Sequence, residues 1–239
     1  NMPINLKQNL SESEIKSGFR FNGIAKLNKN LEVVYLKSIY EILDKNQQVG
    51  EIFFNKSDWD HLNDIEVAKY NGEFFLKDDL FLSLRDANQI VHYRPSKNKV
   101  IRSIVGPFSK QHDVDIISKK EISIFNNNLI PKKNKSSELI IYNLETSQFK
   151  KMYNNLLKAI NFHTYTEGLS DYLGNYNFML EETNQGRIII VNNNNELDLQ
   201  YVNMANNGKK FLVTWSRIIS EIEKITLIKN KIENLKCDT

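Results

Sequence analysis

The sequence is poor in cysteine and has no long apolar run. Cys237 is the sole cysteine among 239 residues and lies close to the carboxyl end. A disulfide framework within the chain is therefore excluded, and a zinc site or a cysteine nucleophile is disfavoured. No apolar run approaches the roughly 20 residues that cross a bilayer, so we expect no membrane span. The first residues also lack the charged-then-apolar pattern of a signal peptide.

Excess charge and phosphate-binding motifs are missing as well. The 32 Lys and Arg residues against 29 Asp and Glu leave a net charge of only +3, which disfavours a nucleic-acid partner. There is no Gly-rich phosphate loop, no HExxH and no GxSxG, so a P-loop enzyme, a zincin and an α/β-hydrolase are all disfavoured. We accordingly expect neither a cofactor nor a metal.

The dominant pattern is a succession of short β-type runs separated by turns that contain Asn, Lys, Asp or Gly. Residues 23–27 and 31–36 predict a hairpin around Asn28–Asn30. Asparagine tolerates the left-handed conformations that tight turns require, so it replaces glycine in many of these turns. Further strand runs follow at 79–84, 89–93, 100–105, 113–117, 121–125, 138–142, 176–181, 187–191 and 197–202.

These runs form a weak internal repeat of about 45 residues, which is the period of a propeller blade. The units are 60–106, 112–155 and 163–204. The repeat predicts an all-β protein, a partial or reduced β-propeller of about 4–6 blades of four-stranded antiparallel sheet with few short helices. A β-sandwich is the competing fold, but it would not repeat at this period. We expect one propeller domain over 1–239, lacking N-terminal blades, with a tail at 218–239.

Helical patterns are few. Ser11 and Glu14 have the spacing of a capping box and predict a short N-terminal helix. Apolar residues keep helical spacing over 149–160 and again over 218–235. We expect the second of these segments to pack against the side of the domain; a partner-binding helix is the alternative.

Polar residues cluster where three predicted strands begin or end. The clusters are 60–64, 83–86 and 106–113, and they contain two of the four histidines, His61 and His112. Because the innermost strands of a propeller converge on a central channel, we expect polar side chains from several blades to meet there.

Four motifs in this region resemble those of arylsulfotransferase-like propellers. They are His61-Leu-Asn63, Ser83-Leu-Arg85, Gly106-Pro-Phe-Ser-Lys-Gln-His112 and Phe125-Asn-Asn127. The resemblance covers about residues 20–220 and is most specific over 58–128. It extends to Thr166-Glu-Gly168 and Trp215-Ser-Arg217.

The resemblance implies sulfuryl transfer between phenols through a sulfated histidine, without a nucleotide donor. His112 would be the nucleophile, and His61 and Arg85 would bind the sulfuryl oxygens. A neutral imidazole is a competent nucleophile, and the forked guanidinium of arginine suits an anionic group. The candidates for binding substrate beside them are Asn63, Asp113, Glu167 and Arg217. The partner would be a phenolic sulfate or another small anion, and the compartment periplasmic or extracellular.

The chain departs from the family pattern in three respects. The family closes six blades, it carries a further histidine upstream of the one matched by His61, and it tends to have histidine where this chain has Asp86. The alternative function is therefore a catalytically silent propeller that binds a small anion, a glycan or a protein. A hydrolase that uses water as acceptor is a third option. An incomplete propeller has open sheet edges, so we expect self-association or contact with another polypeptide, which sedimentation can test.

Overall fold

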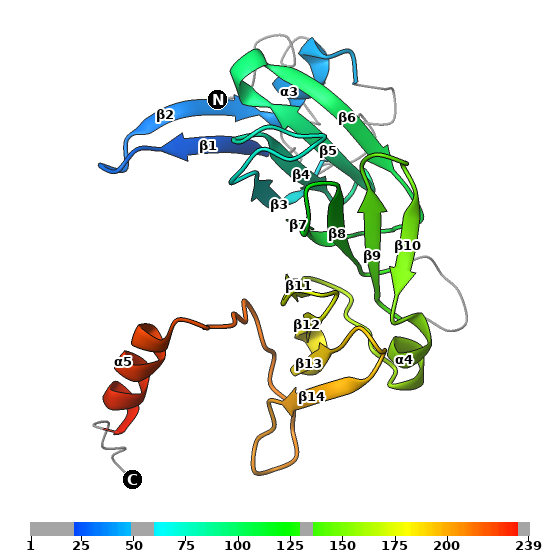
Figure 1. Ribbon diagram of the computed structural model, residues 1–239, viewed down its shortest axis with the longest axis vertical. Coiled ribbons are helices and arrows are strands. Elements are labelled where there is room, and N and C mark those ends of the chain that lie inside the picture. The colour runs from blue at the N-terminus through cyan, green and yellow to red at the C-terminus, as the bar shows by residue number, and fades with distance from the viewer. Residues whose placement is uncertain (1–21, 49–59, 130–135, 234–239) are drawn as a thin grey trace, which may run out of the picture.

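The computed structural model describes residues 22–48, 60–129 and 136–233. Within them the chain forms three four-stranded antiparallel sheets and one two-stranded sheet (Figure 1). In each four-stranded sheet, strands that are consecutive in sequence are also neighbours in space. The helix predicted at Ser11 lies outside the described residues, as does Cys237.

The three sheets fall inside the three predicted repeat units. The first blade comprises β3 (Leu62–Val67), β4 (Leu80–Leu84), β5 (Gln89–Arg94) and β6 (Lys99–Val105). The second comprises β7 (His112–Ile116), β8 (Glu121–Asn126), β9 (Glu138–Asn143) and β10 (Phe149–Met152). The third comprises β11 (Leu169–Tyr172), β12 (Phe178–Glu182), β13 (Arg187–Val191) and β14 (Leu197–Val202). The predicted hairpin is present as β1 (Gly23–Leu27) and β2 (Val33–Ser38).

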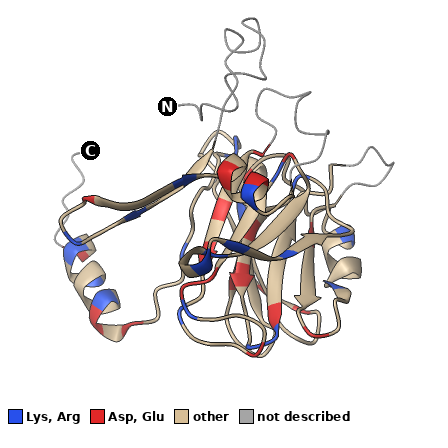
Figure 2. Cartoon of the chain, turned by 90° about the horizontal axis from the view of Figure 1, so that it is seen from above, with Lys and Arg blue, Asp and Glu red and all other residues tan. Residues whose placement is uncertain are grey.

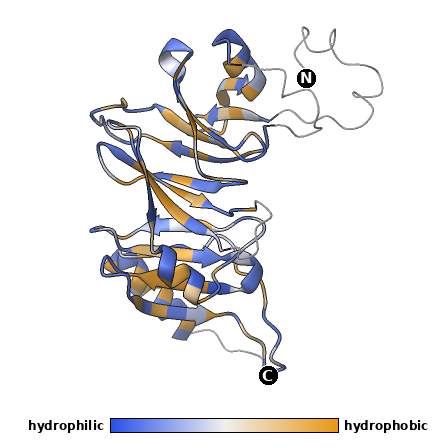
Figure 3. Cartoon of the chain, turned by 90° about the vertical axis from the view of Figure 1, so that its right-hand side faces the viewer, coloured by the Kyte–Doolittle hydropathy of each residue, from blue (hydrophilic) through white to orange (hydrophobic). Residues whose placement is uncertain are grey.

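The sheets pack face to face because the middle strands are apolar on both sides. In β9, Ile140 and Tyr142 enter the core shared with the first blade, whereas Leu139 and Ile141 enter the core shared with the third. This alternation follows from the two-residue period of a strand. Each fully buried Leu or Ile contributes about 1.5–3 kcal/mol. Figure 3 shows the sheets stacked in layers with apolar segments within the stack.

This stack of four-stranded, up-and-down sheets is the architecture of a β-propeller, and the predicted fold class is confirmed. The described residues hold three complete blades and the two-stranded hairpin. Both ends of the stack are open: β14 exposes Leu199 and Tyr201, and β2 exposes Val34 and Leu36. Pairing of these strands with another polypeptide stays a prediction. No helix among the described residues is long and apolar enough to cross a membrane.

The helices differ from expectation in three places. The sequence analysis missed α3 (Ile39–Lys45), although Ser38 and Glu41 form a complete capping box at its start. The pattern over 149–160 is divided between β10 and α4 (Asn154–Ala159), with Tyr153 in a left-handed conformation between them.

The third difference concerns the tail, where α5 (Ile222–Glu233) forms but has no buried residue. The expectation that it packs against the domain is therefore wrong, and Figure 1 shows it apart from the sheets. Two short 3₁₀ turns, η2 (Pro95–Lys97) and η3 (Thr183–Gln185), link strands in the first and third blades.

A buried ion pair stabilises the first blade. Asp79 accepts hydrogen bonds from Arg94 Nε and Nη2 at 2.7 Å and lies 2.8 Å from His92 Nε2. Burial would raise the pKa of Asp79, but these bonds and one from Leu76 N–H outweigh it and hold the pKa below its ordinary value. His92 is thus a structural residue, in agreement with its lack of a match to the family motifs.

We expect Asp79→Ala to lower the free energy of unfolding by about 1–3 kcal/mol, because it leaves the buried His92 and the partly exposed Arg94 without their hydrogen-bond acceptor. Urea denaturation measures the loss. The control is Lys120→Ala, which removes an exposed ion pair to Glu145 and should change stability little. Equal effects of the two variants would contradict a structural role for the buried pair.

Candidate functional site

The first strands of the three blades lie next to one another. Strand β7 contacts both β3 and β11. Side chains bond across these contacts to the neighbouring backbone: Asn63 Nδ2 donates to the Gln111 carbonyl at 2.8 Å, and Val114 N–H donates to Asp64 Oδ2 at 2.8 Å. Asp113 Oδ2 accepts from Ser170 N–H at 2.7 Å and from Ser170 Oγ at 2.9 Å. These bonds hold the three inner strands in register.

Two of the inner strands begin with a β-bulge. The register shifts between Leu62 and Asp64 in β3 and between His112 and Val114 in β7. His61 and Asp113 have positive φ angles of 38° and 48°. A bulge turns consecutive side chains toward one side of a strand. His112 and Asp113 consequently line the same cavity, although neighbours in a regular strand point to opposite faces.

The strand starts enclose a cavity of about 310 Å³. A second cavity of about 680 Å³ shares part of this lining and extends along the inner strands. The smaller cavity is lined by His61, Asn63, Asp64, His112, Asp113, Glu167, Gly168, Leu169, Glu181, Trp215 and Arg217. All the candidate residues except Arg85 therefore meet at one site.

Asn127 fixes the tautomer of His112. Asn127 Nδ2 donates to the carbonyls of Thr164 and Glu167 at 3.0 and 2.9 Å, so its Oδ1 is the atom that faces His112 Nδ1 at 2.7 Å. Because that oxygen only accepts, Nδ1 carries the proton. The lone pair of His112 is therefore on Nε2, which accepts from Glu167 N–H at 3.2 Å.

The turn that carries Glu167 depends on the glycine after it. Glu167 and Gly168 have φ angles of 55° and 91°, and a Cβ on Gly168 would lie 2.4 Å from the Phe125 ring. Glycine alone fits both constraints. The turn thus brings the Glu167 N–H against His112, so that the backbone of Glu167, in addition to its side chain, contributes to the site.

His112 is neutral over the physiological pH range. Burial lowers its pKa to about 4; the hydrogen bond that Nδ1–H donates to Asn127 opposes this shift, while the positive charge of Arg85 adds to it. A neutral imidazole can act as a nucleophile through Nε2 once the hydrogen bond from the Glu167 N–H is released.

Arg85 lies beside the site, with its charge partly compensated. Its backbone N–H donates to the His61 carbonyl at 3.1 Å. Its Nη1 is 2.8 Å from Asp86 Oδ1, which Lys110 Nζ also contacts at 2.8 Å. Arg85 is not among the lining residues of either cavity, and His112 is close enough for its pKa to respond to the guanidinium.

The larger cavity is acidic. Asp64 and Glu66 of β3, Asp113 and Asp115 of β7, and Asp171 of β11 all line it. Burial raises the pKa of the first four. For Asp113 the neighbouring Asp64 carboxylate raises it further, and the pKa reaches about 7. Figure 2 shows acidic segments on the strands in the middle of the molecule. Among the described residues, no group of three or more His, Cys, Asp or Glu side chains is arranged to hold a metal ion.

The sequence analysis missed two parts of the site. Asn127 was noticed within a motif but was given no role, and Trp215 was not considered as a lining residue. His163, which matches no family motif, lies outside both cavities and makes an edge-to-face contact with Tyr165, with the ring centres 4.4 Å apart.

These features define a partial β-propeller with a histidine-centred cavity at its inner strands. Residues 11–204 match the family described as arylsulfotransferase (ASST), and the chain belongs to that family. The resemblance drawn from the sequence is thereby confirmed.

Two solved structures resemble the fold at a distance. Virginiamycin B lyase from Staphylococcus aureus aligns with a TM-score of 0.44 and 11% identity, over 75% of this chain and 48% of that one. A protein of unknown function from Bacteroides caccae aligns with a TM-score of 0.46 and 11% identity, over 80% and 61%. The chain spans less than two thirds of either structure. A search of curated proteins found no match.

We expect Asp113→Asn to raise the free energy of unfolding at about pH 8 by on the order of 1–3 kcal/mol, with little effect near pH 4. The folded-state pKa of Asp113 is raised from 3.8 to about 7, so its stabilising contribution is complete below about pH 4 and is lost as the pH rises through 7. Asparagine removes this loss and still accepts from Ser170. Urea denaturation at the two pH values measures the effect.

The control is Asp198→Asn, which changes an exposed aspartate on β14. An equal gain from both variants, or a gain at Asp113 that does not depend on pH, would contradict the assignment.

Proposed function

We propose that this protein transfers a sulfuryl group from a phenolic sulfate ester to a phenol through a sulfohistidine at His112. The observation that carries the proposal is the state of His112: it is neutral, its Nδ1 proton is held by Asn127, and the residue lines a cavity. Its Nε2 lone pair accepts from the Glu167 N–H at 3.2 Å, a hydrogen bond that the attack on sulfur replaces. Membership of the arylsulfotransferase family supports the same chemistry.

In the first step, His112 Nε2 attacks the sulfur of the ester. The N–S bond forms as the bond from sulfur to the aryl oxygen breaks, and a phenolate leaves. The imidazole becomes positively charged, and Asn127 Oδ1 stabilises that charge through the Nδ1 proton. The Glu167 N–H, which now points at Nε2, can then donate to a sulfuryl oxygen.

In the second step, the oxygen of the acceptor phenol attacks the sulfur and the N–S bond breaks. The new sulfate ester leaves, the neutral imidazole is restored, and the acceptor's proton balances the phenolate formed in the first step. His61, which the family resemblance assigns to binding the sulfuryl oxygens, lines the same cavity and is also our candidate for moving that proton. The positive charges of Arg85 and Arg217 would offset the negative sulfuryl oxygens.

The competing function is a silent propeller that binds an anion, a glycan or a protein. One observation favours it: Asp86 already pairs with Arg85, whose side chain is only 16% exposed, so less of its charge is available to a sulfate. Cleavage of 4-nitrophenyl sulfate distinguishes the transferase from the silent propeller.

Incubation with 4-nitrophenyl sulfate and phenol should release nitrophenolate, and the rate should rise with the phenol concentration. His112→Ala should reduce release by on the order of a thousandfold, because it removes the atom that forms the intermediate. The matched control is His163→Ala, which changes a histidine outside both cavities and should retain activity.

In the same assay, protonation of His112 should not reduce turnover as the pH falls from about 8 to about 5, because the pKa of His112 is about 4. Absence of release from a folded sample would favour the silent propeller. Release that does not depend on phenol would instead indicate hydrolysis.

A further inference from the structure

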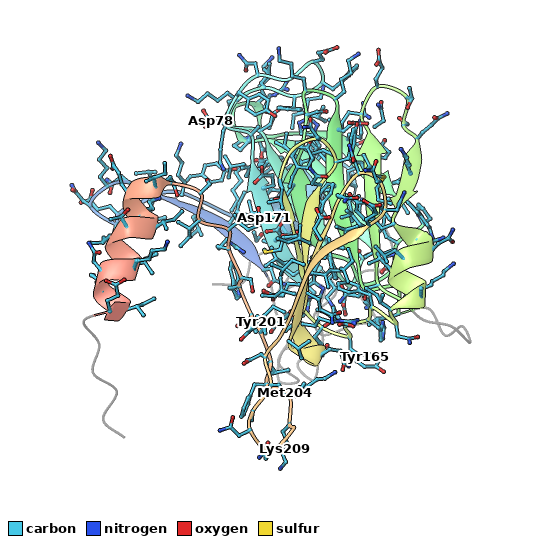
Figure 4. All side chains as sticks on the ribbon, turned by 60° about the horizontal axis from the view of Figure 1, so that its bottom comes forward. Asp78, Tyr165, Asp171, Tyr201, Met204 and Lys209 are labelled. Atoms are coloured by element: carbon cyan, nitrogen blue, oxygen red, sulfur yellow. The ribbon has the colours of Figure 1, made fainter. Side chains whose placement is uncertain are left out.

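A segment beyond the third blade lies against the site. Residues 211–217, called the strap here, follow a loop that projects from the sheets, with Met204 and Lys209 near its end in Figure 4. Backbone bonds fix the strap at three successive points: Phe211 N–H to the Asn203 carbonyl at 2.9 Å, Val213 N–H to the Thr183 carbonyl at 3.4 Å, and Ser216 N–H to Glu181 Oε2 at 2.7 Å. The strap is therefore attached to the body of the third blade.

The last of these bonds holds Trp215 at the opening of the cavities. Trp215 lines both cavities, yet its side chain is 76% exposed, so part of the indole surface faces solvent. Its φ angle is 59°, a conformation that is unusual and costly for a bulky residue. Backbone strain of this kind is kept where the surrounding structure requires one side-chain direction.

Arg217 completes the arrangement. It lines both cavities, and its guanidinium carbon lies 5.2 Å from the centre of the Trp215 ring. Within the described chain, Nη1 donates to the Ser216 carbonyl at 2.8 Å. A guanidinium has five N–H donors, so several remain for an anion.

We propose that Trp215 is the platform for the aromatic ring of the sulfate donor, with Arg217 beside it to bind the sulfate. This inference deepens the proposed function and rests on it. A flat ring stacks on the exposed indole, and a sulfate attached to that ring reaches Arg217 because the guanidinium already lies against the same indole. Arg217 is the one Lys or Arg side chain among the residues that line the smaller cavity, whose lining also includes His61 and His112.

Trp215 and Arg217 follow the segment matched by the family model, which ends at residue 204. The platform predicts that the preference for an aryl sulfate over an alkyl sulfate of similar size and equal charge depends on Trp215.

The experiment compares phenyl sulfate with cyclohexyl sulfate by calorimetry, using His112→Ala so that no turnover occurs. We expect phenyl sulfate to bind about 3- to 10-fold more tightly, which is the range of an aromatic pair. Adding Trp215→Ala should abolish this preference, Trp215→Phe should keep most of it, and Arg217→Gln should weaken both ligands alike. Fluorescence in a Trp59→Phe background, where Trp215 is the remaining tryptophan, should change on addition of phenyl sulfate.

Equal affinity for the two ligands in the parent protein would overturn the platform, as would a preference that survives Trp215→Ala. Thermal melting of each variant establishes that it is folded; Trp215 is mostly exposed, so its replacement should shift the melt little. The test needs no catalysis. No preference in the His112→Ala protein, together with nitrophenolate release from the wild-type protein, would therefore refute the platform alone. A preference in the His112→Ala protein, with no release from the wild-type protein, would refute the transferase alone.

Discussion

The site depends on the packing of the sheets against one another. Because β8 and β9 are apolar on both faces, and β12 and β13 are apolar on the face turned toward them, the second and third blades pack face to face. Their first strands, β7 and β11, therefore lie together. The same packing joins β3 to β7. Because the three strands are adjacent, the residues at their starts line one cavity although they are far apart in the sequence. Hydrogen bonds between these strands, made by the side chains of Asn63, Asp64 and Asp113 to neighbouring backbone groups, then fix how far one strand is shifted along the next.

Much of the fold was predictable because it repeats. The two-residue alternation and the turn residues placed the blades at 60–106, 112–155 and 163–204, and the sheets occupy 62–105, 112–152 and 169–202. Local capping chemistry would also have revealed α3, since Ser38 and Glu41 have the required spacing. The behaviour of α5 was not predictable in this way: an apolar stripe indicates a helix with a face to bury, but it does not say what covers that face.

The site was predictable only where motif and position coincide. His61, Asn63, His112 and Asp113 stand at strand starts, and the cavity collects them. Asn127 and Trp215 also stand in motifs, but the motifs do not give their roles, because these arise from contacts between residues far apart in the chain. Sequence alone also could not show that Asp86 pairs with Arg85, or that one bulge turns both His112 and Asp113 inward.

The central claim is that Nε2 of His112 carries the sulfuryl group between donor and acceptor. The most direct test is to mix the protein with an aryl sulfate in the absence of any phenol acceptor, quench within the first turnover, and analyse the peptides by mass spectrometry. The account predicts one added sulfuryl group, located on His112, that disappears when phenol is supplied before the quench. A rapid burst of phenolate with the group on another residue, or turnover with no adduct on His112 at any time, would contradict it.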